Sequence, residues 1–136
     1  VGVPFADRRG IGVISDFPMM RWAGLAMATS GIGLIFWTSW ALGRLYSPEV
    51  TLQKEHHLVT TGPYQLIRHP RYLGGMIEGI GLSLLFRSWI GLVLTLVFLV
   101  TILFRIRDEE ALMKKEFGLE WENYSKKTWR LAPLIY

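Results

Sequence analysis

The sequence predicts an all-α integral membrane protein, and three apolar runs support this prediction. The first, residues 22–43, carries no charge and meets the ~20-residue length that a helix needs to span a bilayer. The second, residues 88–104, is also uncharged and lies at the short end of the spanning range. The third, residues 72–86, is shorter and contains one acid, Glu78. A soluble domain of 136 residues would rarely contain such runs, so we expect one membrane domain over residues 1–136.

Composition and charge exclude several kinds of functional site and partner. The chain has no cysteine, which excludes a disulfide framework, a thiolate metal site and a cysteine nucleophile. Its net charge is +4, and the basic residues concentrate in segments 44–71 and 105–130, beside the apolar runs. We interpret these segments as cytoplasmic loops that follow the positive-inside bias, and we expect no nucleic-acid partner. A specific site for anionic membrane lipids is the alternative.

The first half of the chain is predicted to hold one spanning helix between two irregular segments. Residues 1–20 are expected to form a juxtamembrane arm, and a helix follows over residues 21–44. Residues 47–71 form a polar loop, in which Gly62-Pro63 predicts a turn and His69-Pro70 predicts a break, because a residue before proline avoids helical geometry. The spanning helix contains small residues that suit close packing against another helix: Ala26, Ala28, Ser30, Gly31 and Gly33.

The second half is predicted to form a transmembrane helical hairpin, residues 72–107, followed by a C-terminal helix and tail, residues 108–136. The two hairpin helices, expected over 71–86 and 88–107, are separated only by Phe86-Arg87-Ser88, which leaves room for a tight connection alone. The second of them continues without a breaker into a charged stretch that ends at Gly118. A short interfacial helix and an extended tail are expected after it.

The hairpin would return the loop 47–71 and the segment 105–130 to the same face of the membrane. These two segments hold all three histidines and most of the ionisable side chains. We infer one polar, aromatic-lined pocket, formed with the C-terminal helix, that opens onto lipid at its base. Such a layout suits a water-soluble cofactor that meets a lipid-borne substrate.

Four ionisable residues are the first candidates for this pocket. Arg105 and Glu109 lie four residues apart and therefore on one helix face. They form either an intrahelical ion pair, which contributes little at a surface, or two separate contacts. In the second case the carboxylate holds cofactor amino or hydroxyl groups, and the guanidinium holds a substrate carboxylate or phosphate. Arg68 and His69 are presented from a loop, and both could contact the pocket. The alternatives are a lipid headgroup for Arg68 and a helix N-terminus for His69.

Other polar residues of the apolar and loop segments also have two interpretations. Tyr64 and Tyr72 are either interfacial belt residues or part of the pocket. Glu78 lies inside an apolar segment, where a charge is costly and suggests a function by default; the alternative is a neutral carboxyl, or one that faces the protein interior near the pocket. His56 and His57 are adjacent, so their side chains diverge, and without further ligand spacing we expect no metal site.

Two motifs on either side of the hairpin carry a family resemblance. The stretch HHLVTTGPYQLIRHPRYLG begins at His56, RIRDEEALMKKEFGLEWENY begins at Arg105, and RLAP follows near the C-terminus. Together they cover residues 56–133, and this pairing resembles the isoprenylcysteine carboxyl methyltransferase family. It is also similar to the wider set of small membrane methyltransferases, including phospholipid N-methylating enzymes.

The resemblance implies a cytoplasm-facing site for S-adenosylmethionine in a multi-pass membrane protein. The expected acceptor is a lipidic or prenylated small molecule, in the first instance an isoprenylcysteine-type carboxylate, reached from the bilayer. The resemblance places the substrate-side catalytic arginine on Arg105, and Glu110 completes an acidic pair with Glu109. The implied cofactor contacts are His56, Leu58, Val59, Gly62, Tyr64, Arg68, His69, Tyr72, Glu109 and Glu110.

Three questions stay open at the level of sequence. Family members with farnesyl substrates have more membrane helices ahead of these motifs. The lipid-tail pocket would here come from the helix at 21–44, from a second copy in a homo-oligomer, or from residues outside this sequence.

Membrane sterol reductases that use NADPH have a similar C-terminal end, in RHPRYLG, GLEWENY and PLIY, although HHLVTTGPY is closer to the methyltransferases. A non-catalytic membrane module is the remaining alternative.

Overall fold

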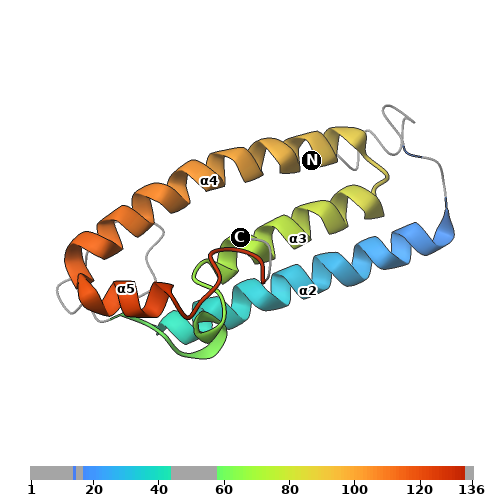
Figure 1. The fold of residues 1–136 in the computed structure, drawn as a ribbon. Coiled ribbons are helices and arrows are strands. Elements are labelled where there is room, and N and C mark those ends of the chain that lie inside the picture. The colour runs from blue at the N-terminus through green and yellow to red at the C-terminus, as the bar shows by residue number, and fades with distance from the viewer. Residues whose placement is uncertain (1–13, 15–16, 44–57, 134–136) are drawn as a thin grey trace. The chain divides into compact units, whose positions relative to one another are not determined.

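The computed structural model describes residue 14, residues 17–43 and residues 58–133. The helices in this part of the chain are α2 (Pro18–Leu42), the short 3-10 helix η2 (Gly62–Gln65), α3 (Pro70–Leu85), α4 (Trp89–Phe117) and α5 (Leu119–Ser125), as Figure 1 shows. The chain divides into two compact units: Val1–Gly33 with Gly74–Thr101, and Leu34–Leu73 with Ile102–Tyr136. The expected all-helical architecture is confirmed, and the predicted helix ends agree with α2 and α3 to within three residues.

Close helix packing defines the first unit. A Cβ added at Gly31 of α2 would lie 2.5 Å from the backbone nitrogen of Glu78 and 2.6 Å from the carbonyl oxygen of Gly74, both on α3. One added at Gly24 would lie 2.5 Å from the nitrogen of Leu85. Only glycine permits such a backbone approach, so the predicted role of Gly31 in helix packing is confirmed. Gly33, by contrast, has nothing within 4 Å of an added Cβ, and the packing role expected for it is wrong.

The connection between α3 and α4 is as tight as the sequence predicts. Arg87 adopts a positive φ of 51°, and the amide nitrogen of Ser88 donates to the carbonyl oxygen of Ser83 over 2.7 Å. The Ser88 hydroxyl accepts from the amide nitrogen of Gly91 over 3.0 Å, which satisfies one of the donors at the start of α4. The turn therefore reverses the chain while its backbone and side-chain groups remain paired.

Two helices in the described part of the chain, α2 and α4, are long and apolar enough to cross a membrane. On α4, large apolar side chains are exposed, among them Val93, Leu96 and Val97, each more than half exposed. Exposed side chains of this kind are costly in water and favourable against lipid. The third apolar run forms α3, which is only 16 residues long.

The second unit is built around the polar end of α4. Beyond Ile102, α4 continues as one helix to Phe117, and Gly118, with a φ of 50°, begins the turn into α5. Ile106 is fully buried, and Trp121 of α5 and Leu131 of the tail are also buried. The second unit thus buries apolar side chains from α4, α5 and the tail near the ionisable residues of α4.

Candidate active site

Two adjacent carboxylates of α4 form the centre of the site. Glu109 and Glu110 are consecutive on the helix, so their side chains leave it about 100° apart and reach different partners. Arg105 lies one turn earlier, and its Nε atom donates to Oε1 of Glu109 over 2.9 Å. Of the two interpretations of the four-residue spacing, the structure shows the intrahelical ion pair, and Arg105 keeps 46% of its side chain exposed.

A short extended segment ahead of α3 faces these carboxylates. Pro70 is the first residue of α3, a position where its missing N–H is tolerated, and it keeps His69 out of the helix. The segment pairs in parallel with the C-terminal tail through the bridge between Ile67 and Trp129. The amide of Trp129 donates to Leu66, and the amide of Arg68 donates to Trp129, over 2.9 and 2.8 Å. The two segments thus position Arg68 and His69 from both sides.

Arg68 connects the tail to α4. Its Nε atom donates to Oε1 of Glu110 over 2.8 Å, and the Arg68 side chain is only 10% exposed. Its Nη1 atom donates to the carbonyl oxygens of Ser125, over 2.7 Å, and of Thr128. A buried guanidinium needs such partners, because removing one member of a buried pair costs about 3–5 kcal/mol. Arg68 therefore lies inside the protein, and the lipid-headgroup interpretation of it is wrong.

His69 lies between the two carboxylates. Its Nδ1 atom is 3.5 Å from Oε2 of Glu109, and its Nε2 atom is 3.5 Å from Oε1 of Glu110. The ring stacks on Tyr72, with centroids 5.7 Å apart. Burial opposes protonation, but the contacts with Glu109 and Glu110 outweigh it, so the pKa of His69 is raised above its ordinary 6.5. The buried Nε2 atom has no hydrogen-bond partner among the described residues.

Three tyrosines complete the surroundings of the acidic pair. The hydroxyl of Tyr72 donates to Oε1 of Glu109, the same oxygen that Arg105 contacts. The hydroxyl of Tyr124 donates to the backbone carbonyl of Tyr64 over 2.7 Å, which ties α5 to η2. Burial raises the pKa of Tyr64 and that of Tyr124 to about 12. The expected pocket interpretation of Tyr72 is consistent with these contacts.

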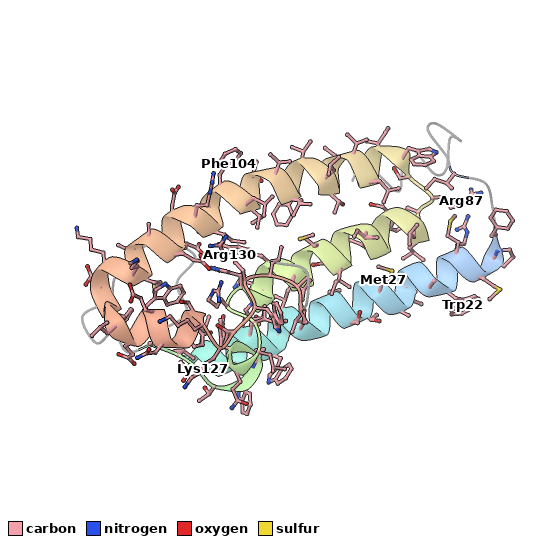
Figure 2. All side chains as sticks on the ribbon, viewed as in Figure 1. Trp22, Met27, Arg87, Phe104, Lys127 and Arg130 are labelled. Carbon is pink, nitrogen blue, oxygen red and sulfur yellow. The ribbon has the colours of Figure 1, made fainter. Side chains whose placement is uncertain are left out.

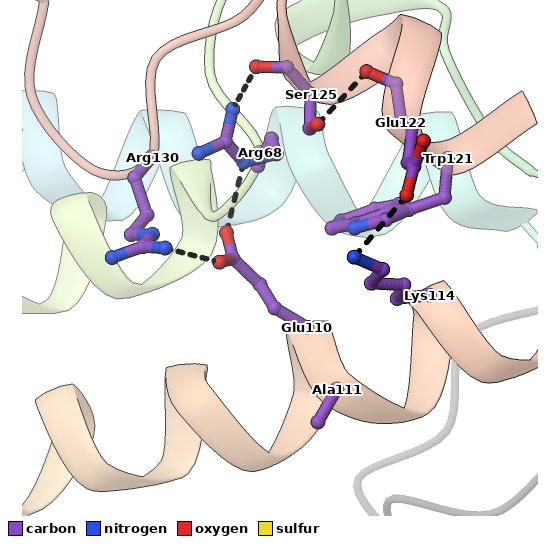
Figure 3. Close-up of a pocket in the computed structure, with 8 residues that line it drawn as sticks. All are labelled: Arg68, Glu110, Ala111, Lys114, Trp121, Glu122, Ser125 and Arg130. Carbon is purple, nitrogen blue, oxygen red and sulfur yellow. Dashed lines mark hydrogen bonds and ion pairs between the residues drawn. The ribbon is translucent and has the colours of Figure 1, made fainter. Parts of the chain in front are cut away.

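A cavity of about 310 Å³ adjoins the acidic pair on the side of Glu110, which Figure 3 shows. Arg130 of the tail donates to Oε2 of Glu110 over 2.8 Å, and Lys114 pairs with Glu122 over 3.2 Å. The cavity therefore presents fixed charges of both signs beside a buried indole. Its lining consists of Arg68, Glu110, Ala111, Lys114, Trp121, Glu122, Ser125 and Arg130.

The structure gathers some of the predicted site residues and not others. The hydrogen-bonded and ion-paired cluster consists of Arg68, His69, Tyr72, Arg105, Glu109 and Glu110. Gly62 lies at the start of η2 with a φ of 60°, a backbone conformation that favours glycine. Leu58 and Val59 lie ahead of η2 and are partly exposed. His56 is outside the described residues.

Sequence reasoning missed Arg130 and Trp121 as members of the site. Arg130 contacts Glu110 directly, although it lies 20 positions away in the sequence, and Trp121 is buried beside the cavity. Both residues fall in the quoted family motifs, Trp121 in GLEWENY and Arg130 in RLAP, but apart from these the sequence offered only the basic and aromatic character of residues 119–136. That character is equally typical of an interfacial tail, so it could not single out either residue.

The described part of the chain offers no grouped set of metal ligands. There, no three histidine, aspartate or glutamate side chains are grouped so that they could hold a metal ion. His69, Glu109 and Glu110 instead satisfy one another and the surrounding arginines. The adjacent pair His56-His57 lies outside the described residues.

Comparison with known proteins adds a family match. A model of the family described as "phospholipid methyltransferase" matches residues 19–120. The chain is 39% identical over 83 residues to the protein-S-isoprenylcysteine O-methyltransferase of Schizosaccharomyces pombe, covering 60% of this chain and 35% of that protein. It is 31% identical to the nickel-cobalt-cadmium resistance protein NccN of Alcaligenes xylosoxydans, over 84% of this chain and 53% of that protein.

A solved structure is similar as well. It is the eukaryotic intramembrane Ras methyltransferase ICMT, with a TM-score of 0.76 and 26% sequence identity, over 88% of this chain and 46% of that chain. A probable protein-S-isoprenylcysteine O-methyltransferase of Oryza sativa is 29% identical over 90% of this chain and 65% of its own length. The chain thus spans from about a third to about two thirds of the length of these relatives.

Proposed function

The chain belongs to the phospholipid methyltransferase family, and we propose that it transfers a methyl group from S-adenosylmethionine to a lipid-borne acceptor at the membrane interface. One observation carries the proposal. Glu109 and Glu110, on the helix that also provides an apolar span, are held by Arg68 and His69 from the loop before α3 and by Tyr72 from its first turn. A soluble donor and a lipid-borne acceptor need such a junction of polar and apolar surface.

The residues present fit the chemistry of the donor. S-adenosylmethionine offers an ammonium, a carboxylate, ribose hydroxyls and an adenine ring, which call for carboxylates, cations and aromatic or apolar surface. The described site contains all three and a buried, unpartnered Nε2 atom on His69, and a cavity of about 310 Å³ adjoins it at Arg68 and Glu110. Pockets for small ligands begin at about this volume. We assign the donor contacts to Leu58, Val59, Gly62, Tyr64, Arg68, His69, Tyr72, Glu109 and Glu110, and to His56 outside the described residues.

The charge balance of the site favours an anionic acceptor. Arg68, Arg105 and Arg130 face two carboxylates, so the cluster has one net positive charge even with His69 neutral. A prenylcysteine-type carboxylate would be attracted to this field, whereas the ammonium of an unmethylated phospholipid headgroup would be repelled. Arg105 is the most exposed of the three arginines, at 46% of its side chain, so we assign it the acceptor carboxylate.

The chemistry asks little of the protein beyond positioning. When bound, the donor supplies a methyl group on a sulfonium centre, which an ionised carboxylate can attack in line without a general base. Holding two reactants in that geometry contributes about 7–11 kcal/mol to lowering the barrier. The tasks of this chain are to bind the donor through the acidic pair, to orient the acceptor through Arg105 and to exclude water.

The membrane arrangement follows from the same proposal. The basic segments beside the spans favour a cytoplasmic face for the site, and α2, α3 and α4 would each cross the bilayer. Because the chain covers only part of its relatives, the surface for a lipid tail would come from α2, from a second copy or from further residues. The acceptor, the number of crossings and any homo-oligomer are therefore parts of the proposal.

Calorimetry on the purified protein in nanodiscs would test the donor. We expect saturable binding of S-adenosylhomocysteine and none of NADPH. Glu109→Ala should lose this binding, while Glu116→Ala, an exposed glutamate on the same helix, should keep it. Arg105→Ala should still bind S-adenosylhomocysteine but lose methyl transfer to a prenylcysteine substrate. Binding of NADPH alone would instead support a reductase, and normal binding and turnover by Glu109→Ala and Arg105→Ala would contradict this site.

A further inference from the structure

Arg130, in the tail that follows α5, contacts the acidic site through both its backbone and its side chain. Its carbonyl oxygen accepts a hydrogen bond from the amide of His69 over 3.1 Å. Its Nη2 atom lies 2.8 Å from Oε2 of Glu110. The donor and acceptor contacts assigned above do not include Arg130. Its effect on the site therefore has to act through these two neighbours.

The backbone and the side chain of Arg130 have separate tasks. The tail docks on the loop before α3 through main-chain hydrogen bonds, among them those that the amides of Arg68 and His69 donate. These bonds use no side-chain atom, so a substitution at position 130 can keep them. The guanidinium is therefore not needed for docking the tail, and its contact with the carboxylate calls for another explanation.

Two arginines hold the carboxylate of Glu110 from different segments, as Figure 3 shows. Arg68 contacts Oε1 over 2.8 Å and the ring of His69 lies 3.5 Å from the same oxygen, whereas Arg130 contacts Oε2. The last torsion of a glutamate is broad, so partners at one oxygen alone leave the carboxylate free to turn. A guanidinium at each oxygen fixes its plane. Each oxygen can still accept a further hydrogen bond, so Glu110 offers itself to a ligand in a fixed direction.

We propose that Arg130 is a positioning residue for the methyl donor, which holds Glu110 in the orientation that accepts an ammonium or hydroxyl group of S-adenosylmethionine. The proposal rests on the donor site proposed above. A side chain that is fixed before the ligand arrives loses less rotamer freedom on binding, so the affinity rises without any contact between Arg130 and the ligand. The acceptor is assigned to Arg105, so the loss of Arg130 should affect the donor selectively.

Binding of S-adenosylhomocysteine to the full chain in nanodiscs tests this role. This ligand carries one ammonium and one carboxylate, so the net charge of the site contributes little to its binding. Arg130→Ala should weaken binding by about tenfold, the effect of losing one hydrogen bond to a charged group. Arg130→Lys should recover most of the affinity, because an ammonium can also donate to Oε2. Lys127→Ala removes the same charge from an exposed position of the tail, which lies apart from Arg130 in Figure 2, and should bind normally.

Turnover separates positioning from two other roles. With a farnesylated cysteine as the acceptor, Arg130→Ala should raise the KM for the donor by the same factor and leave kcat and the KM for the acceptor unchanged. A raised KM for the acceptor would instead show that Arg130 contacts the acceptor, and would overturn the proposal. An equal loss of kcat in Arg130→Ala and Arg130→Lys, with a lowered melting temperature in both, would show a structural role alone and overturn it as well.

Chemical labelling of carboxyl groups reports on Glu110 without any ligand. A water-soluble carbodiimide couples glycine ethyl ester to accessible carboxyl groups, and mass spectrometry reads each site. Glu110 is 13% exposed and held at both oxygens, so it should be protected in the unmodified protein, while the exposed Glu116 is labelled. Labelling of Glu110 should rise in Arg130→Ala and stay low in Lys127→Ala. If it stays low in both variants, Arg130 does not fix Glu110 and the proposal fails.

The behaviour of the unmodified protein separates this proposal from the donor site on which it rests. If the unmodified protein does not bind S-adenosylhomocysteine, the donor site is wrong and the role of Arg130 in donor binding fails with it. If the unmodified protein and Arg130→Ala bind this ligand equally well, the donor site stands and the role of Arg130 alone is overturned.

Discussion

His69 shows how the surroundings of one residue decide its protonation state. Its ring nitrogens each lie 3.5 Å from a different carboxylate, at the outer limit of a hydrogen bond but close enough for a strong charge interaction. Burial alone would keep the ring neutral, and the two carboxylates reverse that preference. When it is protonated, the ring carries a positive charge 3.5 Å from Glu109 and from Glu110, on the loop side of the acidic pair.

The raised pKa of His69 predicts a pH-dependent stability. A histidine whose folded pKa exceeds its unfolded value contributes stability that is complete below the unfolded pKa, near 6.5, and that is lost as the pH rises through the folded pKa. The melting temperature in detergent should therefore fall across this window on the alkaline side. His69→Gln should lack this component, so the difference between the two melting curves isolates it. A difference that is constant with pH would contradict this charge interaction.

At the scale of elements, α2 and α3 of the first unit depend on glycine for their approach. The backbone atoms of Gly74 and Glu78 lie where a side chain at position 31 would begin. In a membrane, van der Waals contact contributes much of the free energy of helix association. The hydrophobic effect contributes little there, because lipid tails are as apolar as the side chains. A one-carbon change at such a contact therefore has a larger effect than helix propensity would suggest.

Matched glycine variants on α2 test this packing. Gly31→Ala should destabilise the protein by about 1–3 kcal/mol, because the added methyl group meets backbone that cannot move aside. Gly33→Ala, two residues away on the same helix, adds its methyl group to open space and should stabilise by about 0.5–1 kcal/mol through helix propensity. Titration with a denaturing detergent would measure both. Equal effects of the two substitutions would exclude this contact as a determinant of stability.

For the whole molecule, membrane insertion is the dominant physical condition. The large apolar side chains exposed on α2 and α4 would be unfavourable in water and are favourable against lipid. The family match and the similar intramembrane structure also indicate a membrane protein. The polar groups gather instead in the second unit, where they satisfy one another. Along α4, exposed apolar side chains such as Val93 and Val97 precede the ion-paired Arg105, Glu109 and Glu110.

An arginine placed on α4 should disturb insertion in a position-dependent way. Val97 is 55% exposed within the apolar part of α4, and an arginine at a span centre costs about 2.5–3.5 kcal/mol of insertion. Val97→Arg should lower the fraction that resists alkaline carbonate extraction. Leu119→Arg, at an even more exposed position on α5, should leave that fraction unchanged. Release of the unmodified chain by carbonate would contradict the integral membrane assignment.

Elements that depend on local signals were predictable from the sequence alone. Apolar run length predicted α2 and α4, Pro70 predicted the start of α3, and Gly118 predicted the break before α5, because each is a property of neighbouring residues. The spacing of Arg105 and Glu109 predicted that they share a helix face, and left open the ion pair that the structure shows. The motifs at 56–72 and 105–124 identified the family, which the comparisons confirm.

Contacts between distant segments were decided only by the tertiary structure. The tail pairs with the loop before α3 through backbone hydrogen bonds, which leave no residue pattern in a sequence. That pairing is why Arg130 reaches Glu110 and why Arg68 is buried under carbonyl oxygens of the tail instead of exposed to lipid. Each charged side chain has several residues of opposite charge in the sequence that could be its ion-pair partner. The packing of the folded chain selects one of them, because burying a charge without a partner is too costly.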